Sequence, residues 1–505
     1  LRVSEQQSNP CAVSRFVAPH VNPNAMNNRQ SHSRQPPQVC ILVSYPYSGV
    51  APLMRLFTEH PDCHVTNSLA LADITGLDRS IGNSVTSHRV FSDCLASHGR
   101  WLISDVEVGD GEEWSHQAHL ENAATRPVLA VRDPIRVLKH WKENARGNAY
   151  QLIGLFKNMF QMLEQVPADA NTIILYEKLI SCPRREVGRI CARWGLPLPD
   201  RILGDVADAW SDDCKGRLRR QWHLSSLFQS EDAPPPSAPC HSPLSNSEKD
   251  MIEEHLGRLY LRCWQDDAQE LQKILLEKTW IGFDLDDTLH EFRRASSAAT
   301  SKVLAEISAK HGVPIEALSK EYSKVLRAKT ANAFSDGKTS FDYRRERFRS
   351  TLDGFALPYD EPFMTELLEC YETTLVASLE LKCGAVGLLS TIKNMGKKIV
   401  VITEGPQDSQ ERTIDALGIG GYVDFVATTN RFRVAKTDGL FGKVLAHLGI
   451  SSSDVAYVGD SEQRDMVPAM AAGIFSIHLA EEKDVLLIAS PPRINTLRKL
   501  QYIIS

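Results

Sequence analysis

The sequence predicts an α/β protein with two parallel-sheet domains, and two observations support this prediction. Short apolar runs, each long enough for one buried strand, end at turns and alternate with segments of helical apolar spacing. This alternation is typical of parallel sheets covered by helices. The chain has 505 residues, of which 42% are hydrophobic and 24% charged, so it is long enough to bury more than one core.

The overall composition excludes several classes of protein. The formal net charge of −6 provides no general basic field for nucleic acid. No apolar run approaches the roughly 18 residues of a membrane span, and the polar N-terminus lacks a signal-peptide stretch. The 11 cysteines are odd in number and scattered, which favours reduced thiols. We therefore expect a cytoplasmic protein that binds neither nucleic acid nor membrane.

The first domain is predicted to span residues 38–275, after a disordered arm over 1–37 that is rich in Asn, Gln, Ser and Pro. A Pro/Ser-rich loop is expected at 231–247, followed by an amphipathic helix. Buried strands are predicted at 39–43, 128–131 and 172–176, and helices follow the first two of them.

The second domain is predicted to span residues 278–484, with a C-terminal tail over 485–505. It opens with a strand at 280–283, and a long, mostly helical insert at about 292–383 separates this strand from the rest of the sheet. The later strands are predicted at 399–402, 425–427 and 455–458.

Carboxylates follow the first strand of this second domain directly. Asp284 and Asp286 are alternate residues at the strand end, so they can converge on one ligand. Two carboxylates this close repel each other unless a cation lies between them, and their oxygens suit Mg²⁺. One of them can also act as a covalent nucleophile towards phosphorus.

Further polar residues follow the later strands. Thr403 ends the strand at 399–402, and its hydroxyl and the nearby N–H groups could hold phosphate oxygens. Lys436 offers a cation for a phosphoryl group. Asp460 and Asp465 add two acids at the turn after the strand at 455–458.

Together these motifs resemble those of the haloacid dehalogenase-like hydrolase superfamily. The segments are Asp284-x-Asp286-x-Thr288, Thr403, Lys436 and Gly459-Asp460-x-x-x-x-Asp465, in that order. The resemblance covers roughly residues 278–483 and implies a Rossmann-like core whose helical insert forms a cap. Glu404 departs from it, because the family often has Asn there.

The resemblance also implies a role for each residue. Asp284 would be the nucleophile that forms an aspartyl-phosphate, and Asp286 the general acid and base. Thr403 and Lys436 would bind the transferring phosphoryl group. Mg²⁺ would be held by Asp284, the backbone carbonyl of Asp286, and Asp460, with Asp465 supporting.

The presence of Asp286 implies phosphoryl chemistry, because the dehalogenase branch of the superfamily lacks this second aspartate. A phosphatase that hydrolyses a small phosphorylated metabolite is the leading interpretation, since a cap limits access to the site. The basic run 344–347 within the insert is interpreted as a charged helix face rather than an anion site.

The N-terminal domain carries a different motif. The segment 44–49, between a strand and a helix, is laid out like a phosphate-binding loop, although it lacks the Gly-Lys-Ser/Thr ending of a Walker A loop. It resembles the 5′-phosphosulfate loop of sulfotransferases, and Arg132-Asp133-Pro134 resembles their 3′-phosphate motif. This likeness implies a sulfonucleotide held by Ser48, Gly49 and Arg132 in a P-loop domain.

Several residues depart from the sulfotransferase pattern. Tyr47 stands where that family has Lys or Arg, Val50-Ala51 where it has hydroxyl residues, and His140 where it has Ser. A missing cation removes transition-state stabilisation, so we expect doubtful activity in this half. A bifunctional sulfotransferase and phosphatase, and a non-catalytic interaction protein with vestigial sites, remain as alternatives.

Overall fold

The structure is a computed structural model, and it describes most of the chain. The arm predicted at 1–37, and residues 231–243 of the predicted loop, lie outside the described residues. Within the described part no helix is long and apolar enough to cross a membrane, and the cysteines there are free thiols. The described ranges are 38–45, 47–58, 60–67, 100–107, 126–144, 147–165, 173–198, 244–329 and 334–505.

The first sheet has five parallel strands in the order β2-β3-β1-β4-β5. The predicted strands correspond to β1, β4 and β5, of which the last is shorter than expected because Tyr176 already begins a helix. Strands β2 and β3 were not predicted. The bounds are β1 Gln38–Ser44, β2 Cys63–Asn67, β3 Trp101–Glu107, β4 Val128–Val131 and β5 Ile173–Leu175.

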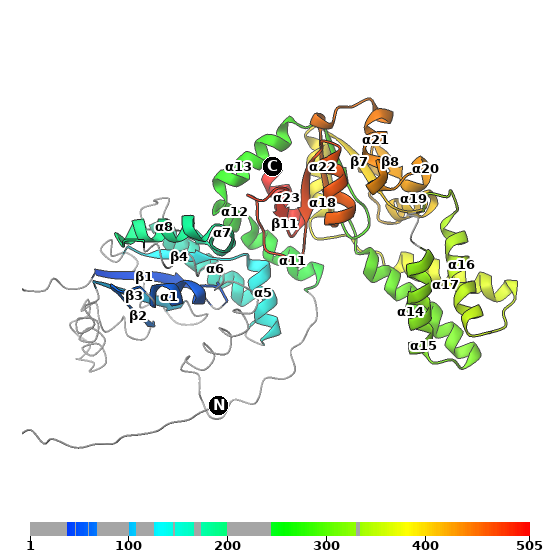
Figure 1. Cartoon of the computed structure of the whole chain (residues 1–505), viewed down its shortest axis with the longest axis horizontal. Helices are drawn as coiled ribbons and strands as arrows, with labels where there is room; N and C mark the ends of the chain where they lie inside the picture. The colour runs from blue at the N-terminus through cyan, green and yellow to red at the C-terminus, as the bar shows by residue number, and fades with distance from the viewer. Residues whose placement is uncertain are drawn as a thin grey trace, which may run out of the picture.

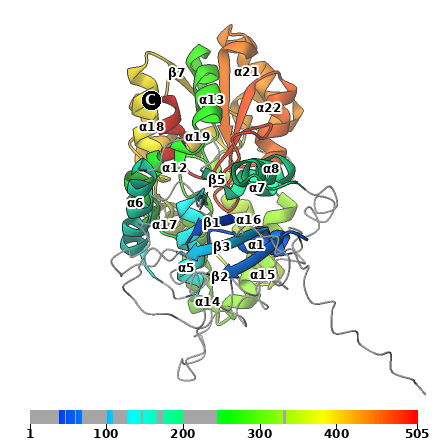
Figure 2. The same ribbon diagram turned by 90° about the vertical axis from the view of Figure 1, so that its left-hand side faces the viewer.

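Helices cover both faces of this sheet, because alternate residues of its central strands point to opposite sides. Ile41 and Val43 pack against α5 (Pro134–Glu143) and α6 (Ala149–Gln165). Cys40 and Leu42 pack in a separate cluster with α1 (Ala51–Thr58) and α8 (Pro183–Trp194). Figure 2 shows α6 on one side of the strands and α1 and α8 on the other.

The second sheet has six parallel strands in the order β11-β10-β9-β6-β7-β8. Two parallel-sheet α/β domains are therefore confirmed. Strand β6 lies in the middle of the sheet, so its carboxyl end opens between β7 and β9. The bounds are β6 Trp280–Phe283, β7 Lys398–Thr403, β8 Phe425–Thr428, β9 Val455–Gly459, β10 Phe475–Leu479 and β11 Arg493–Ile494.

The predicted C-terminal tail is in fact part of this second domain. Strand β11 extends the sheet beyond residue 484, and α23 (Leu497–Ile504) buries Leu500 and Ile503 against α18 (Ala385–Asn394). The segment 497–504 places its apolar residues on one helical face, and burial of that face fixes the helix to the sheet.

The helical insert forms a body of its own beside the sheet, shown at the lower right of Figure 1. Its helices enclose a separate apolar cluster that includes Leu304, Phe348 and Leu367. The insert thus has the independent core that a cap needs. Its helices are α14 (Phe292–His311), α15 (Ile315–Lys329), α16 (Ser340–Gly354) and α17 (Glu361–Ala377).

Helices of residues 246–277 lie between the two sheets and join them through one continuous apolar core (Figure 1). They are α11 (Asn246–Ile252), the π-helical turn η3 (Glu253–Gly257), α12 (Arg258–Arg262) and α13 (Gln265–Glu277). A buried ion cluster crosses the same joint: the Lys499 ammonium donates to Glu253 and lies 3.3 Å from a carboxylate oxygen of Asp133. Because such charges are stable only when paired, this cluster fixes the two domains to each other.

Candidate active site

Asp284 stands directly at the carboxyl end of β6. Its backbone N–H donates to the carbonyl of Val458 on β9 at 2.9 Å, which extends the sheet pairing by one residue and fixes the side chain. Asp284 is 5% exposed, and the Thr288 hydroxyl donates to its Oδ2 at 3.4 Å. Burial raises the pKa of Asp284 well above its usual range, and the neighbouring Lys436 opposes this effect.

Lys436 lies at the start of the short 3₁₀ turn η5 (Lys436–Asp438) and is 2% exposed. Its ammonium donates to Asp284 Oδ1 and to Asp465 Oδ1, each at 2.6 Å. Burial alone would lower the pKa of Lys436, but these two carboxylates outweigh it and raise the pKa. Glu404, the residue that departs from the family pattern, accepts the backbone N–H of Lys436 at 3.2 Å.

Asp460 and Asp465 come from the segment after β9. Asp465 lies in the π-helical turn η7 (Glu462–Met466), and its Oδ2 accepts the Ser461 N–H at 3.0 Å. A Cβ on Gly459 would lie 2.5 Å from the Asp465 carboxyl carbon, so only glycine allows this close approach.

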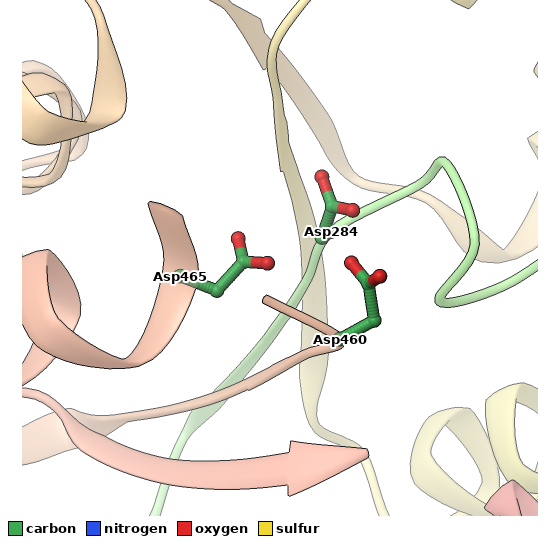
Figure 3. Close-up of side chains that lie close together, drawn as sticks. All are labelled: Asp284, Asp460 and Asp465. Atoms are coloured by element: carbon green, nitrogen blue, oxygen red, sulfur yellow. The ribbon is translucent and has the colours of Figure 1, made fainter. Parts of the chain in front are cut away.

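Three carboxylates surround one small space (Figure 3). Asp284, Asp460 and Asp465 each offer an oxygen, and these oxygens lie within 4.8 Å of one another. Asp465 accepts three protein hydrogen bonds, from Lys436, from the Tyr457 hydroxyl at 2.9 Å and from the Ser461 N–H. The Asp284 carboxylate accepts two and that of Asp460 one, from the exposed Arg293, so these two carboxylates are better able to take a hard cation such as Mg²⁺.

The side chain of Asp286 lies outside this cluster. Its Oδ1 is 3.0 Å from the Nε2 of His290, and its Oδ2 accepts from the Gln410 amide at 3.3 Å. The Thr403 hydroxyl donates to Oε1 of the same Gln410 at 3.0 Å. Gln410 thus connects Thr403 to Asp286. Neither Gln410 nor His290 was predicted from the sequence. The only sequence signal for a role at the site is that His290 closely follows the motif at 284–288 and Gln410 lies on the helix after Thr403.

A cavity of about 550 Å³ opens between the sheet and the cap. The core side contributes Asp284, Asp286, Thr403 and Lys436, the four residues predicted to be catalytic. The opposite wall comes from the cap and is lined by Tyr322, Phe334, Tyr343, Arg344, Arg347 and Tyr371.

Cap and core are linked beside this cavity. Arg412, on α19 (Gln407–Ala416) of the core, donates to Glu372 of α17 at 2.9 Å and to the Ser340 hydroxyl at 2.8 Å. Asp408, also on α19, accepts the Ser340 N–H at 3.0 Å. These contacts hold the cap over the predicted catalytic residues.

Comparison with known proteins identifies a family for the C-terminal part of the chain. The profile of the haloacid dehalogenase-like hydrolase family matches residues 281–479. The C-terminal half of the chain is a haloacid dehalogenase-like hydrolase domain. This domain makes the protein a hydrolase, as the sequence predicted.

Relatives of the haloacid dehalogenase-like domain include phosphatases. A glyceraldehyde 3-phosphate phosphatase of Methanocaldococcus jannaschii is 28% identical over 203 residues, which cover 40% of this chain and 84% of that protein. The corresponding Pyrococcus abyssi phosphatase is 26% identical over 198 residues, covering 39% and 79%. A solved 2-haloacid dehalogenase from Pseudomonas syringae is 23% identical, with coverage of 45% and 98% and a TM-score of 0.36.

The predicted nucleotide loop of the N-terminal domain is closely packed. Ser48 is 1% exposed, and its hydroxyl has no hydrogen-bond partner among the described residues, while its N–H donates back to the Tyr45 carbonyl at 2.9 Å. Gly49 has φ +86°, and a Cβ there would lie 2.2 Å from the ring of Tyr176. This aromatic ring therefore covers the glycine from one side.

Arg132, predicted to bind a nucleotide phosphate, has other partners. Its guanidinium carbon lies 4.3 Å from the Tyr176 ring centroid, and its Nη2 lies 3.5 Å from the carboxylate of Asp484 in the hydrolase domain. Arg136 Nε lies 3.4 Å from the same carboxylate. An acid of the C-terminal domain thus takes the position that an anionic ligand of Arg132 would need. None of the comparisons supports the predicted sulfotransferase resemblance.

Proposed function

We propose that the protein is a Mg²⁺-dependent phosphatase that hydrolyses a small phosphorylated metabolite through an aspartyl-phosphate on Asp284. The observation that carries this proposal is the convergence of Asp284, Lys436 and the Thr403–Gln410–Asp286 chain on one cavity. The phosphatases among the relatives of this domain support the same reaction class.

In the first step, a carboxylate oxygen of Asp284 attacks phosphorus and the bond to the ester oxygen breaks. Asp286 gives its proton to the departing oxygen, so the product leaves as an alcohol. Lys436 and the Thr403 hydroxyl stabilise the charge on the transferring phosphoryl oxygens. The contacts of Asp286 with His290 and Gln410 fix the position of its carboxyl group, and the residue lines the cavity.

In the second step, Asp286 is a carboxylate and accepts a proton from water. The water oxygen attacks phosphorus, the bond to Asp284 breaks, and inorganic phosphate leaves. Asp284 is then again a free carboxylate and Asp286 again carries a proton, so both groups return to their starting state.

The donor set fits a divalent cation. Asp284 and Asp460 would hold Mg²⁺ together with the carbonyl of Asp286, while Asp465 would keep Lys436 in place. Phosphatases of this family generally use Mg²⁺. The bound ion supplies positive charge that favours the approach of a phosphate dianion to the carboxylates. Burial also raises the pKa of Asp460, which a nearby cation would offset.

The decisive experiment is hydrolysis of an aryl phosphate by the full chain, with and without Mg²⁺. We expect activity that chelation abolishes and fresh Mg²⁺ restores. Asp284→Asn should abolish turnover without unfolding the protein, because the change is nearly isosteric. More than a tenth of wild-type turnover in that variant, or full activity in excess chelator, contradicts the assignment.

For the N-terminal domain we propose a scaffold without sulfuryl transfer. The ion pair of Arg132 with Asp484 and the ring of Tyr176 over Gly49 support this reading. Titration calorimetry of the full chain with adenosine 3′,5′-bisphosphate, the desulfated product, should show no binding. Micromolar binding that Arg132→Ala removes would instead favour a bifunctional enzyme.

A further inference from the structure

We infer that the cap carries an oxyanion subsite, formed by Tyr343 and Arg347, which recognises a second anionic group on the substrate. This inference rests on the proposed phosphatase function and names the class of substrate. The substrate would be a phosphomonoester that bears a carboxylate or a second phosphate at the end away from the reacting phosphorus.

Helix α16 brings these side chains to the cavity. Tyr343, Arg344 and Arg347 occupy positions that share one helical face, and all three line the cavity opposite Asp284. Arg345 lies on another face, where it pairs with Glu361 on the surface. The basic run 344–347 was interpreted from sequence as a charged helix face. In the structure Arg344 and Arg347 line the cavity, whereas Arg345 lies at the surface.

Tyr343 and Arg347 on this face carry polar atoms that have no acceptor among the described residues. The Tyr343 side chain is buried, with the residue 7% exposed, and its hydroxyl has no hydrogen-bond partner among the described residues. The Nε and Nη2 atoms of Arg347 are also buried and lack a partner there. One edge of this guanidinium reaches the phenol of Tyr322, but no described carboxylate forms an ion pair with it.

Arg344 differs from Arg347 in having a counter-ion. Its guanidinium donates to Glu372 and lies 4.5 Å from the ring centroid of Tyr371. Glu372 also accepts from Arg412 of the core, so its position is fixed. Glu372 thus balances the charge of Arg344, whereas no carboxylate in the described part of the chain forms an ion pair with Arg347.

Buried guanidinium atoms without a hydrogen-bond partner are costly, and they can only donate hydrogen bonds. A ligand that contacts Arg347 must therefore present acceptors, and an oxyanion also supplies the opposite charge. Tyr343 can donate a further hydrogen bond to the same group. The cavity of about 550 Å³ falls within the range of pockets for drug-sized ligands.

The test compares aryl phosphates that differ only in the para substituent. The reference compound is phenyl phosphate, and its analogues carry a para carboxylate attached directly or through two or four methylene groups, or a para phosphate. The measured quantity is the ratio of kcat/KM between each anionic compound and phenyl phosphate. For at least one compound we expect a preference of about tenfold or more in the wild type.

Arg347→Gln should reduce this ratio to near one, and Tyr343→Phe should lower it severalfold. Arg345→Gln is the matched control, because it removes a neighbouring charge on the same helix outside the cavity, and it should keep the wild-type ratio. Circular dichroism and melting temperature establish that each variant is folded. A preference for carboxylate or for phosphate compounds identifies the natural anion.

Hydrolysis of phenyl phosphate with no preference for any anionic compound overturns the subsite while leaving the phosphatase function intact. A preference that persists in folded Arg347→Gln, or that Arg345→Gln removes equally, also overturns it. Failure to hydrolyse any compound in the series with Mg²⁺ present refutes the phosphatase function itself.

Discussion

Replacement of Lys436 by Met tests how the buried charges of the hydrolase domain balance one another. Lys436 is 2% exposed and donates to both Asp284 and Asp465 at 2.6 Å. Met keeps an unbranched side chain of similar length but removes the ammonium. The two carboxylates would then lie in a buried site without their shared cation.

Removal of one partner from a buried ion pair costs about 3–5 kcal/mol, because the remaining charge stays desolvated. For a domain of this size, 1 kcal/mol corresponds to about 2–4 °C, so we expect the melting temperature of the hydrolase domain to fall by roughly 10 °C. Scanning calorimetry in chelator would measure this fall. Mg²⁺ should raise the melting temperature of Lys436→Met more than that of the wild type, because the ion replaces part of the missing charge.

Lys443→Met is the matched control, because Lys443 is an exposed lysine on α21 (Leu440–Leu448) of the same domain. The melting temperature of this variant should equal that of the wild type. A Lys436→Met melting temperature within about 2 °C of wild type in chelator would show that the carboxylates do not depend on this cation. Equal Mg²⁺ stabilisation of the variant and the wild type would contradict the predicted replacement of charge.

Three further outcomes are expected. Burial, with the nearby carboxylates of Asp484 and Asp133, raises the pKa of Glu177 to about 8, so the folded protein binds this proton more tightly and loses stability as pH rises from about 4.5 to 8. Glu177→Gln should therefore show a smaller fall in melting temperature between pH 5 and 8.5, and parallel curves would contradict this. Gln410→Leu should lower kcat by about tenfold to a hundredfold through misplacement of the residues that it connects, as steady-state kinetics would show; an unchanged kcat would exclude that role. Arg412→Met should speed amide hydrogen exchange in α16, because it releases the cap from the core, and unchanged exchange would mean that other contacts hold the cap.

Much of the hydrolase domain could be predicted from sequence, because its signals are local. Each of the four strands predicted in this domain is a short apolar run, whereas β10 and β11, which contain Ser, His and Arg, were not predicted. A strand end fixes where the next polar residue lies, so Asp284, Thr403 and Asp460 could be expected at one edge of a sheet. The structure brings them together as expected. The strands β2 and β3 escaped prediction because their polar and apolar residues mix without a clear buried run.

Contacts between distant segments could not be predicted in this way. Nothing near Gln410 in the sequence indicates that it connects Thr403 to Asp286, and nothing near Arg132 indicates that Asp484, from the other domain, pairs with it. The C-terminal segment was predicted to be a tail because the sequence does not show that its apolar face packs against α18.

Local sequence patterns were enough to predict the α/β class, the positions of the catalytic candidates and the presence of a helical insert, because strand and helix periodicity depends only on neighbouring residues. Which side of each insert helix faces the core depends instead on packing between distant segments. The run 344–347 has the same charges whichever way α16 turns, and packing of Phe348 and Leu352 into the cap core rotates Tyr343 and Arg347 towards the cavity while leaving Arg345 at the surface.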